Sequence, residues 1–141
     1  MFKLIEEHRD LFTVGEEYHL AHCISGDLAL GAGIAKQFRD KMNMKEELRK
    51  RYPQGFNGNG CIQVGKVFNL VTKPNFWDKP TYLTLKIALL QMKDMIIVQG
   101  IKKLAIPLIG CGLDMLEWSL VKSVLVEVFG DLDIEILVCI K

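Results

Sequence analysis

The segment Ile134-Glu135-Ile136-Leu137-Val138-Cys139-Ile140 is apolar at every position except Glu135. A strand without alternating polar residues is typical of a sheet whose two faces are both covered, usually by helices. Directly before it, Leu116–Phe129 carries apolar residues at helical spacing. A helix followed by a fully buried strand predicts an α/β arrangement at this end of the chain.

The same alternation continues towards the N-terminus. Lys103–Leu108 predicts a strand. The helix before it begins at Pro80 and ends before Gly100, and these two residue types suit the two ends of a helix. The preceding segment, Val67–Val71, is rich in β-branched and apolar residues and predicts another strand.

The first half of the chain is less regular. Phe2–Ile5 and His19–Ile24 are candidate strands, and Ile34–Arg51 predicts one or two helices. The stretch Gln54–Gly60 contains three glycines and two asparagines, which is typical of turns. Strands that alternate with helices predict an α/β sandwich, and we expect residues 1–141 to form one domain.

Composition narrows the class of protein. Of 141 residues, 50% are hydrophobic and 25% are charged, and the net charge of +1 gives no sign of a polyanion partner. No apolar run approaches the roughly 18 residues of a membrane span, and Met1 opens onto a strand-like segment instead of a signal peptide. The cysteines show no CxxC spacing, so we expect reduced thiols and a cytoplasmic location.

The first segment with unusual chemistry runs from Ser25 to Ala35, between a strand and a helix. Gly31 and Gly33 would let the backbone approach a ligand closely, and the start of the helix offers free N–H groups to an anion. Glycines at these positions are equally compatible with a tight turn alone. The spacing matches neither a Walker loop nor a full dinucleotide-binding fingerprint.

A second strand-to-helix loop, Pro107–Asp114, contains glycines that could form another phosphate-binding nest of N–H groups. Asp114 has two interpretations. With Glu117 three residues later, its spacing favours a helix N-cap over a catalytic role. Cys111 could be a nucleophile, but all three histidines lie in the first sixth of the chain, and a buried structural thiol is more common.

The third segment, Val71-Thr72-Lys73-Pro74, ends a predicted strand with a lysine. A lysine there is usually a solvated surface residue. In an apolar or cationic site its neutral amine becomes a nucleophile. His19 and His22 lie three apart on a predicted strand, so they face opposite sides and are poor metal ligands. The basic stretch Lys36–Arg51 predicts a solvated helical face that could also assist a nucleic-acid partner.

Together, these segments resemble the macrodomain family, specifically the terminal ADP-ribose protein glycohydrolases and the related antitoxins that remove ADP-ribose from DNA. The similarity extends over essentially the whole chain in matching order. The matching residues are Ala21-His22-Cys23-Ile24-Ser25, Gly31-Ala32-Gly33-Ile34-Ala35, Thr72-Lys73, Lys79-Pro80-Thr81-Tyr82, and Ile109-Gly110-Cys111-Gly112-Leu113-Asp114 with Trp118.

The resemblance implies a three-layer α/β/α fold with a mixed central sheet, and a hydrolase that binds ADP-ribose across the carboxyl edge of that sheet. Lys73 would attack the anomeric carbon of the distal ribose, Asp114 would act as general acid and base, and Asp10 would accept a hydrogen bond from adenine. The resemblance assigns ADP-ribose contacts to Asp10, Leu11, Ser25, Gly31, Ala32, Gly33, Ile34, Ala35, Thr72, Pro107, Ile109, Gly110, Cys111, Gly112 and Leu113.

The resemblance also implies partners. We expect ADP-ribose and ADP-ribosylated protein, with modified nucleic acid and O-acetyl-ADP-ribose as alternative substrates, and a monomer that needs no metal or cofactor. The sequence does not decide between linkages to glutamate, to a nucleobase and to acetate. Arg9 departs from the family pattern, since most macrodomains have glycine before the aspartate. The asparagine-rich loop of other hydrolytic macrodomains is replaced by His22–Ser25. The alternative functions are a non-catalytic ADP-ribose reader and a scaffold that binds no nucleotide.

Overall fold

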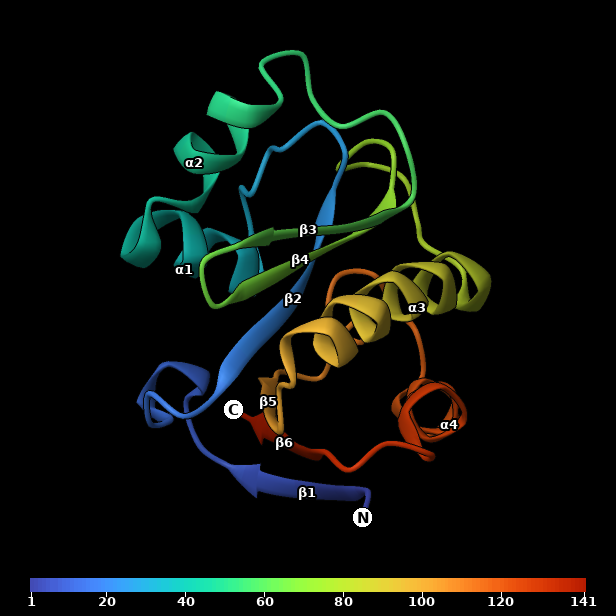
Figure 1. Ribbon diagram of the computed structural model, residues 1–141. Coiled ribbons are helices and arrows are strands. Elements are labelled where there is room, and N and C mark those ends of the chain that lie inside the picture. Colours follow the sequence, from blue (N-terminus) through green and yellow to red (C-terminus); the bar gives the residue numbers. More distant parts are fainter.

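The computed structural model describes residues 1–141 and has one six-stranded sheet with helices on both faces (Figure 1). In chain order its elements are β1 (Lys3–His8), the 3-10 helix η1 (Leu11–Thr13), β2 (His19–Ser25), α1 (Gly33–Met42), α2 (Met44–Arg51), β3 (Gly60–Val64), β4 (Val67–Lys73), α3 (Tyr82–Gln99), β5 (Lys103–Ile106), α4 (Trp118–Phe129) and β6 (Glu135–Ile140).

The order of strands in the sheet decides which loops meet. The strands are arranged β1-β6-β5-β2-β4-β3, and all neighbours are parallel except the antiparallel pair β3 and β4. Because β5, β2 and β4 are parallel neighbours, the loops that follow them leave the same edge of the sheet. These are the three segments whose chemistry the sequence singles out.

Two apolar cores separate the layers. Side chains of α3 and α4, such as Leu89 and Leu125, pack on one face, and Phe38 of α1 and Leu48 of α2 pack on the other. Figure 1 shows the two helix pairs on opposite sides of the strands. Residues of β6 alternate between the two cores, so the predicted burial of this strand on both faces and the three-layer α/β/α fold are confirmed.

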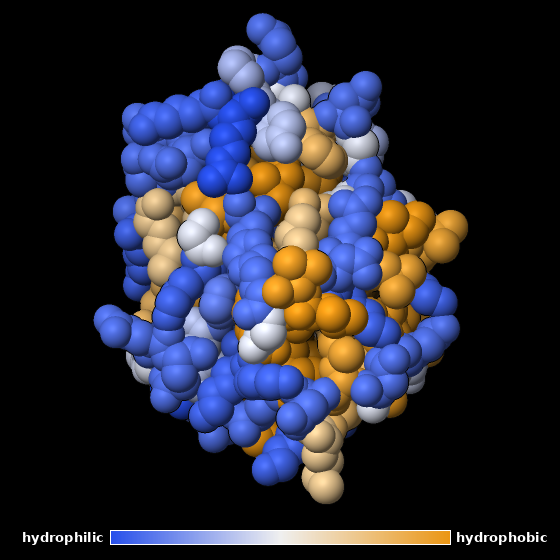
Figure 2. All heavy atoms as spheres, viewed as in Figure 1, coloured by the Kyte–Doolittle hydropathy of each residue, from blue (hydrophilic) through white to orange (hydrophobic).

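The outer side of α3 is also apolar. Leu83, Leu90 and Ile97 are exposed at seven-residue spacing, and apolar atoms gather over α3 on the face that Figure 2 presents. None of the helices combines the length and the apolar character that crossing a membrane requires.

Strand β3 is missing from the sequence-based assignment, which describes Gln54–Gly60 only as turn material. Gly65, at φ 57°, and Lys66 connect β3 to β4 in a tight hairpin. A β-carbon on Gly60 would lie 2.2 Å from Oε1 of Gln91, an atom that accepts the N–H of Cys61. Contact with a side chain of α3 therefore fixes the start of the strand, and this contact is not visible in local sequence.

His22 is fully buried on β2, and it faces away from His19, as the spacing predicts. Its ring stacks on Phe38, and His19 lies near Phe68 in the other core. Nε2 of His22 lies 2.6 Å from Oδ1 of Asn69, whose Nδ2 donates to the carbonyl of Ile62. The Nε2–H tautomer therefore donates to Asn69, and Nδ1 is a buried acceptor without a partner.

Protonation of His22 is expected to destabilise the fold below neutral pH. Burial outweighs the Asn69 hydrogen bond and lowers the pKa of His22 to about 4, whereas an unfolded histidine titrates near about 6.5. Between these values the unfolded chain binds a proton that the folded chain does not. The free energy of unfolding therefore decreases as the pH is lowered, by about 3 kcal/mol at most. Urea denaturation at pH 7 and pH 4.5 measures this loss, and His22→Gln should lose less. Equal losses in both proteins would refute the assignment.

Candidate functional site

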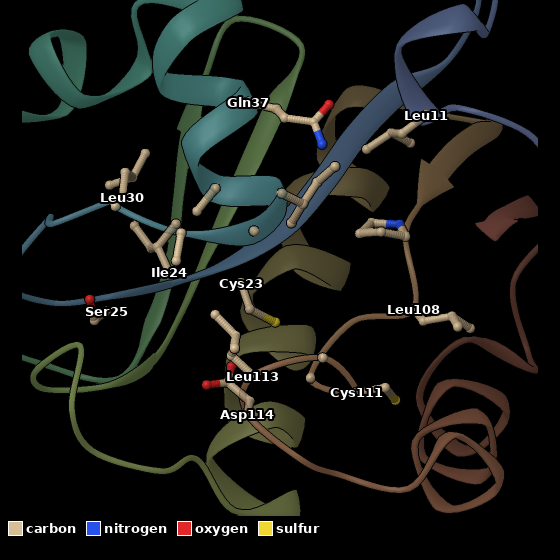
Figure 3. Close-up of a pocket in the computed structure, with 18 of the residues that line it drawn as sticks. Leu11, Cys23, Ile24, Ser25, Leu30, Gln37, Leu108, Cys111, Leu113 and Asp114 are labelled. Atoms are coloured by element: carbon tan, nitrogen blue, oxygen red, sulfur yellow. The ribbon is translucent and has the colours of Figure 1, made fainter. Parts of the chain in front are cut away.

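A cavity of about 820 Å³ opens at the carboxyl edge of the sheet. Residues from the loops after β2, β4 and β5 line it, together with Asp10 and Leu11 (Figure 3). Lys73 and Asp114 border the same space. A concave site of this size with a few polar groups is the usual form of a small-molecule site.

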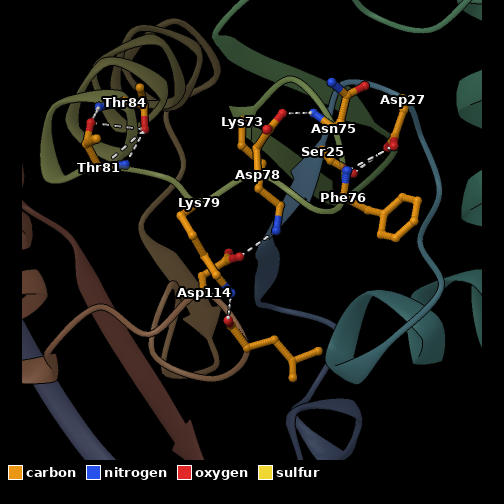
Figure 4. Close-up of polar contacts among 11 residues, drawn as sticks. Ser25, Asp27, Lys73, Asn75, Phe76, Asp78, Lys79, Thr81, Thr84 and Asp114 are labelled. Atoms are coloured by element: carbon orange, nitrogen blue, oxygen red, sulfur yellow. Dashed lines mark hydrogen bonds and ion pairs between the residues drawn. The ribbon is translucent and has the colours of Figure 1, made fainter.

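Lys73 and Asp114 form an ion pair inside this cavity. Nζ of Lys73 lies 2.6 Å from Oδ1 of Asp114, and the two side chains are only 13% and 15% exposed (Figure 4). Lys73 is the last residue of β4, and Asp114 belongs to the loop after β5. Because neither charge has full access to water, each one relies on the other for stabilisation, and removing one partner would leave the other charge partly buried and unpaired.

Asp114 is not the N-cap of α4, so that interpretation is wrong. The cap position is Glu117, whose side chain makes no capping hydrogen bond. Leu116 donates its N–H to the carbonyl of Gly110, and Met115 has a left-handed φ of 65°. This turn separates Asp114 from the helix and directs its carboxylate to Lys73.

The first glycine loop meets the cavity at the start of α1. Its residues Gly31, Ala32, Gly33, Ile34 and Ala35 all line the cavity. Ala32 occupies the N-cap and makes no side-chain capping hydrogen bond. No N-cap side chain therefore accepts from the first N–H groups of this ten-residue helix. Gly33 has a φ of 57°, a conformation that favours glycine. The loop can therefore present backbone donors to an anion.

The second glycine loop faces the first across the cavity. Gly110 has a φ of 73°, and a β-carbon there would lie 2.9 Å from Cδ1 of Leu116. Gly112 is exposed and borders the cavity, and a β-carbon on it would meet no atom within 4 Å. The protein itself leaves this space open beside Gly112.

Cys111 lines the cavity, but its surroundings do not favour a nucleophile. Its Sγ donates to the carbonyl of Ile109 at 3.3 Å, and burial raises the pKa of the thiol. The neighbouring Cys23 also lines the cavity, and burial raises its pKa to about 12. Thiols of this kind remain protonated near neutral pH and react poorly.

At the other end of the cavity, Asp10 begins η1. One carboxylate oxygen accepts the N–H of Phe12 at 2.9 Å, and the other lies 3.1 Å from Nζ of Lys141. Arg9 fits this turn because its guanidinium donates to the hydroxyl and the carbonyl of Thr13. The residue that departs from the family pattern thus stabilises the turn and also lines the cavity.

The structure brings together all but two of the residues that the resemblance assigns to the site. Thr72 and Ile109 are buried and do not line the cavity. Successive side chains of a strand point to opposite faces, so Thr72 points away when Lys73 points in. The ligand contacts expected of these two residues stay predictions.

Sequence reasoning missed Asp27, which joins two loops of the site. One carboxylate oxygen accepts from Ser25 Oγ at 2.5 Å and from the N–H of Ala29 at 3.2 Å, and the other accepts the N–H of Phe76 at 2.9 Å (Figure 4). Burial alone would raise the pKa of Asp27, but these hydrogen bonds outweigh it and lower the pKa. A carboxylate therefore holds the first glycine loop against the connection that follows Lys73.

Lys79, Phe76 and Gln37 also line the cavity without having been predicted. Nζ of Lys79 donates to the carbonyl of Leu113 at 2.7 Å, which ties the connection after β4 to the loop that carries Asp114. The only sequence signal for Lys79 is its place before Pro80-Thr81-Tyr82 in the family resemblance.

Comparison with known proteins places this site in context. The chain is 38% identical to the human ADP-ribose glycohydrolase OARD1 over 130 residues, which are 92% of this chain and 86% of that protein. The bovine ADP-ribose glycohydrolase OARD1 matches with the same identity and coverage. No protein-family profile matches the chain.

Solved structures agree on the fold. The macrodomain of Mycobacterium tuberculosis DarG superposes with a TM-score of 0.83 at 21% identity, covering 99% of this chain and 98% of that one. The macrodomain of Thermus aquaticus DarG gives 0.80 at 19% identity, covering 99% of both chains. A structure of Thermosipho africanus DarTG in complex with ADP-ribose gives 0.76 at 18% identity, covering 99% of this chain and 42% of that one.

Proposed function

The chain belongs to the macrodomain ADP-ribose glycohydrolases, and from this premise we propose that it hydrolyses terminal ADP-ribose linkages with Lys73 as nucleophile and Asp114 as acid and base. Membership of the family makes the chain an ADP-ribosyl hydrolase. The observation that carries the proposed mechanism is the 2.6 Å contact between Nζ of Lys73 and the Asp114 carboxylate inside the cavity.

ADP-ribose has a natural orientation in this cavity. Its adenine would lie beside Leu11, with the adenine amino group donating to Asp10 in place of the Lys141 contact. Its diphosphate would lie between the two glycine loops, whose N–H groups and helix start favour an anion. The distal ribose then reaches Lys73 and Asp114.

The chemistry follows from this placement. Asp114 takes a proton from the Lys73 ammonium, and the free amine attacks the anomeric carbon as the bond to the leaving oxygen breaks. Ring opening gives a Schiff base between Lys73 and the ribose. Water adds to that carbon, the C–N bond breaks, and Asp114 returns the proton to the departing amine. The net reaction consumes one water and releases ADP-ribose and the group it modified.

The geometry favours ester-linked substrates. A carboxylate leaves without needing a proton, whereas a nucleobase nitrogen needs one, and the proposed mechanism keeps the proton of Asp114 for the release of Lys73. The glutamate ester of a modified protein and the anomeric acetate ester of ADP-ribose both meet this condition. To test this preference, the protein is incubated with these two esters and with ADP-ribosylated DNA, and the released ADP-ribose is measured. The esters should be cleaved faster than the DNA linkage.

A reader that only binds ADP-ribose is the second candidate, and it has no need of a partly buried lysine–carboxylate pair at the distal end of the cavity. Such a pair is costly to bury unless it serves the site. The same incubation separates the two functions, because a reader would retain the modified substrate and release nothing.

Gly112→Val is expected to weaken ADP-ribose binding at least about tenfold without loss of stability. A β-carbon at Gly112 meets no neighbouring atom within 4 Å, and Gly112 borders the space assigned to the diphosphate. Calorimetry measures the affinity and thermal denaturation reports the fold, with Gly112→Ala as the smaller member of the series. Unchanged affinity of Gly112→Val would show that the diphosphate does not bind at this loop. If ADP-ribose added to folded wild-type protein gave no heat of binding, ADP-ribose binding itself would be contradicted.

A further inference from the structure

Four large apolar side chains are exposed in the two connections that follow Lys73 and carry Asp114. Phe76 and Trp77 are 61% and 66% exposed, and Leu113 and Met115, on either side of Asp114, are 67% and 75% exposed. Phe76 and Leu113 line the cavity itself. We refer to these four residues as the apolar mouth.

Hydrogen bonds hold the apolar mouth in position. The N–H of Phe76 donates to Asp27, and its ring meets that of Trp77 edge to face with centroids 5.0 Å apart. Lys79 joins the two halves through the carbonyl of Leu113, as Figure 4 shows. The aromatic pair is therefore presented on an ordered connection, where exposed apolar surface usually marks an interaction site.

The position of the mouth identifies what it meets. Once the distal ribose lies at Lys73 and Asp114, the group attached to its anomeric carbon must extend past these residues and out of the cavity. Lys73 precedes the connection that carries Phe76 and Trp77, and Asp114 lies between Leu113 and Met115. Both halves of the mouth thus flank the point where the modified molecule enters.

The charges at this point favour protein over nucleic acid. The Lys73 ammonium is paired with Asp114, whereas Lys79 donates to a neutral carbonyl and keeps its charge. Asp27, which accepts the N–H of Phe76, and Asp78, which accepts that of Asn75, offset this charge. The seven basic residues between Lys36 and Arg51 lie on α1 and α2, where Arg49 donates to the carbonyl of Asp27. Nucleic-acid binding draws on free lysines and arginines for the phosphates, and the mouth offers apolar surface in their place.

We propose that the apolar mouth is a docking surface for an apolar side chain next to the modified residue of an ADP-ribosylated protein. This inference rests on the proposed function. Its consequence is a sequence preference: peptides with a large apolar residue beside the modified glutamate are cleaved faster than peptides with a small polar one.

The test compares wild-type protein with two variants on four substrates. Trp77→Ser removes a large exposed side chain of the mouth, and Trp77 does not line the cavity. Val98→Ser, at an 86% exposed apolar residue near the far end of α3, is the matched control. The substrates are glutamate-linked ADP-ribosyl peptides with leucine or serine as the flanking residue, the anomeric acetate ester of ADP-ribose, and ADP-ribosylated single-stranded DNA. The value of kcat/KM is measured for each.

Wild-type protein and Val98→Ser should prefer the leucine peptide by about tenfold, the scale of burying one apolar side chain. Trp77→Ser should lose most of this preference and hydrolyse the acetate ester at the wild-type rate. An unchanged preference in Trp77→Ser overturns the docking surface alone. If the variant loses activity only toward ADP-ribosylated single-stranded DNA, the mouth binds nucleic acid, and the proposed docking surface for an apolar side chain is overturned. If wild-type protein hydrolyses none of the esters, the proposed function falls and this inference with it.

Discussion

Lys73→Ala is expected to reduce release of ADP-ribose from a modified substrate by at least about 10³-fold while free ADP-ribose still binds. The substitution removes the nucleophile, and loss of a residue of this kind typically costs several orders of magnitude in kcat. In the proposed orientation, the diphosphate contacts come from backbone groups of the two glycine loops and do not involve the lysine amine. Release is followed by chromatography of the free nucleotide, and binding by calorimetry.

Lys73→Arg is the matched control for charge. It preserves a cation opposite Asp114, but a guanidinium does not give up its proton near neutral pH and cannot attack the anomeric carbon. Arginine should therefore fail to restore release. Normal turnover by either variant would eliminate the lysine mechanism.

Asp114→Ala is expected to be the second variant with a large loss of turnover, of about 10²- to 10⁴-fold, the range of general acid–base catalysis. Lys73 must then lose its proton to solvent, which slows the attack on the anomeric carbon, and no group remains to return the proton that releases the amine. The variant should therefore accumulate ADP-ribose bound covalently to Lys73.

Asp114→Asn separates proton transfer from hydrogen bonding. The amide oxygen can accept from Nζ of Lys73 as the carboxylate does at 2.6 Å, but it cannot carry the proton. The structure places Asp114 outside the N-cap of α4, so the asparagine has no capping role to preserve. Full activity of Asp114→Asn would contradict the acid–base role.

Much of the site could be predicted because it depends on local sequence and on one rule of sheet geometry. The parallel strands β2, β4 and β5 end at Ser25, Lys73 and Ile106. Because they are neighbours, the loops that follow them lie at one edge of the sheet. Glycines in two of these loops and a lysine in the third predict an anion site beside a nucleophile, once the family resemblance assigns their roles.

The remaining features depend on contacts between distant residues. The spacing of Asp114 and Glu117 matches a helix cap, yet the turn closed by Gly110 and Leu116 moves the helix start past Asp114. Asp27 gains its role only when the connection after β4 comes to lie over the first glycine loop. Thr72 lies next to Lys73 in the chain but on the opposite face of the strand. Local patterns do not specify such pairings, because the strand order creates them.

The most direct test of the lysine mechanism is mass spectrometry of Asp114→Ala after exposure to a glutamate-linked ADP-ribosyl substrate. Intact mass reports whether ADP-ribose is attached to the protein, and peptide mapping identifies the residue, with the Lys73→Ala, Asp114→Ala double variant as the control. The proposed mechanism predicts an adduct on Lys73 in the single variant and none in the double variant. An Asp114→Ala protein that stays unmodified while it still turns over substrate, or an equal adduct in the double variant, would contradict it.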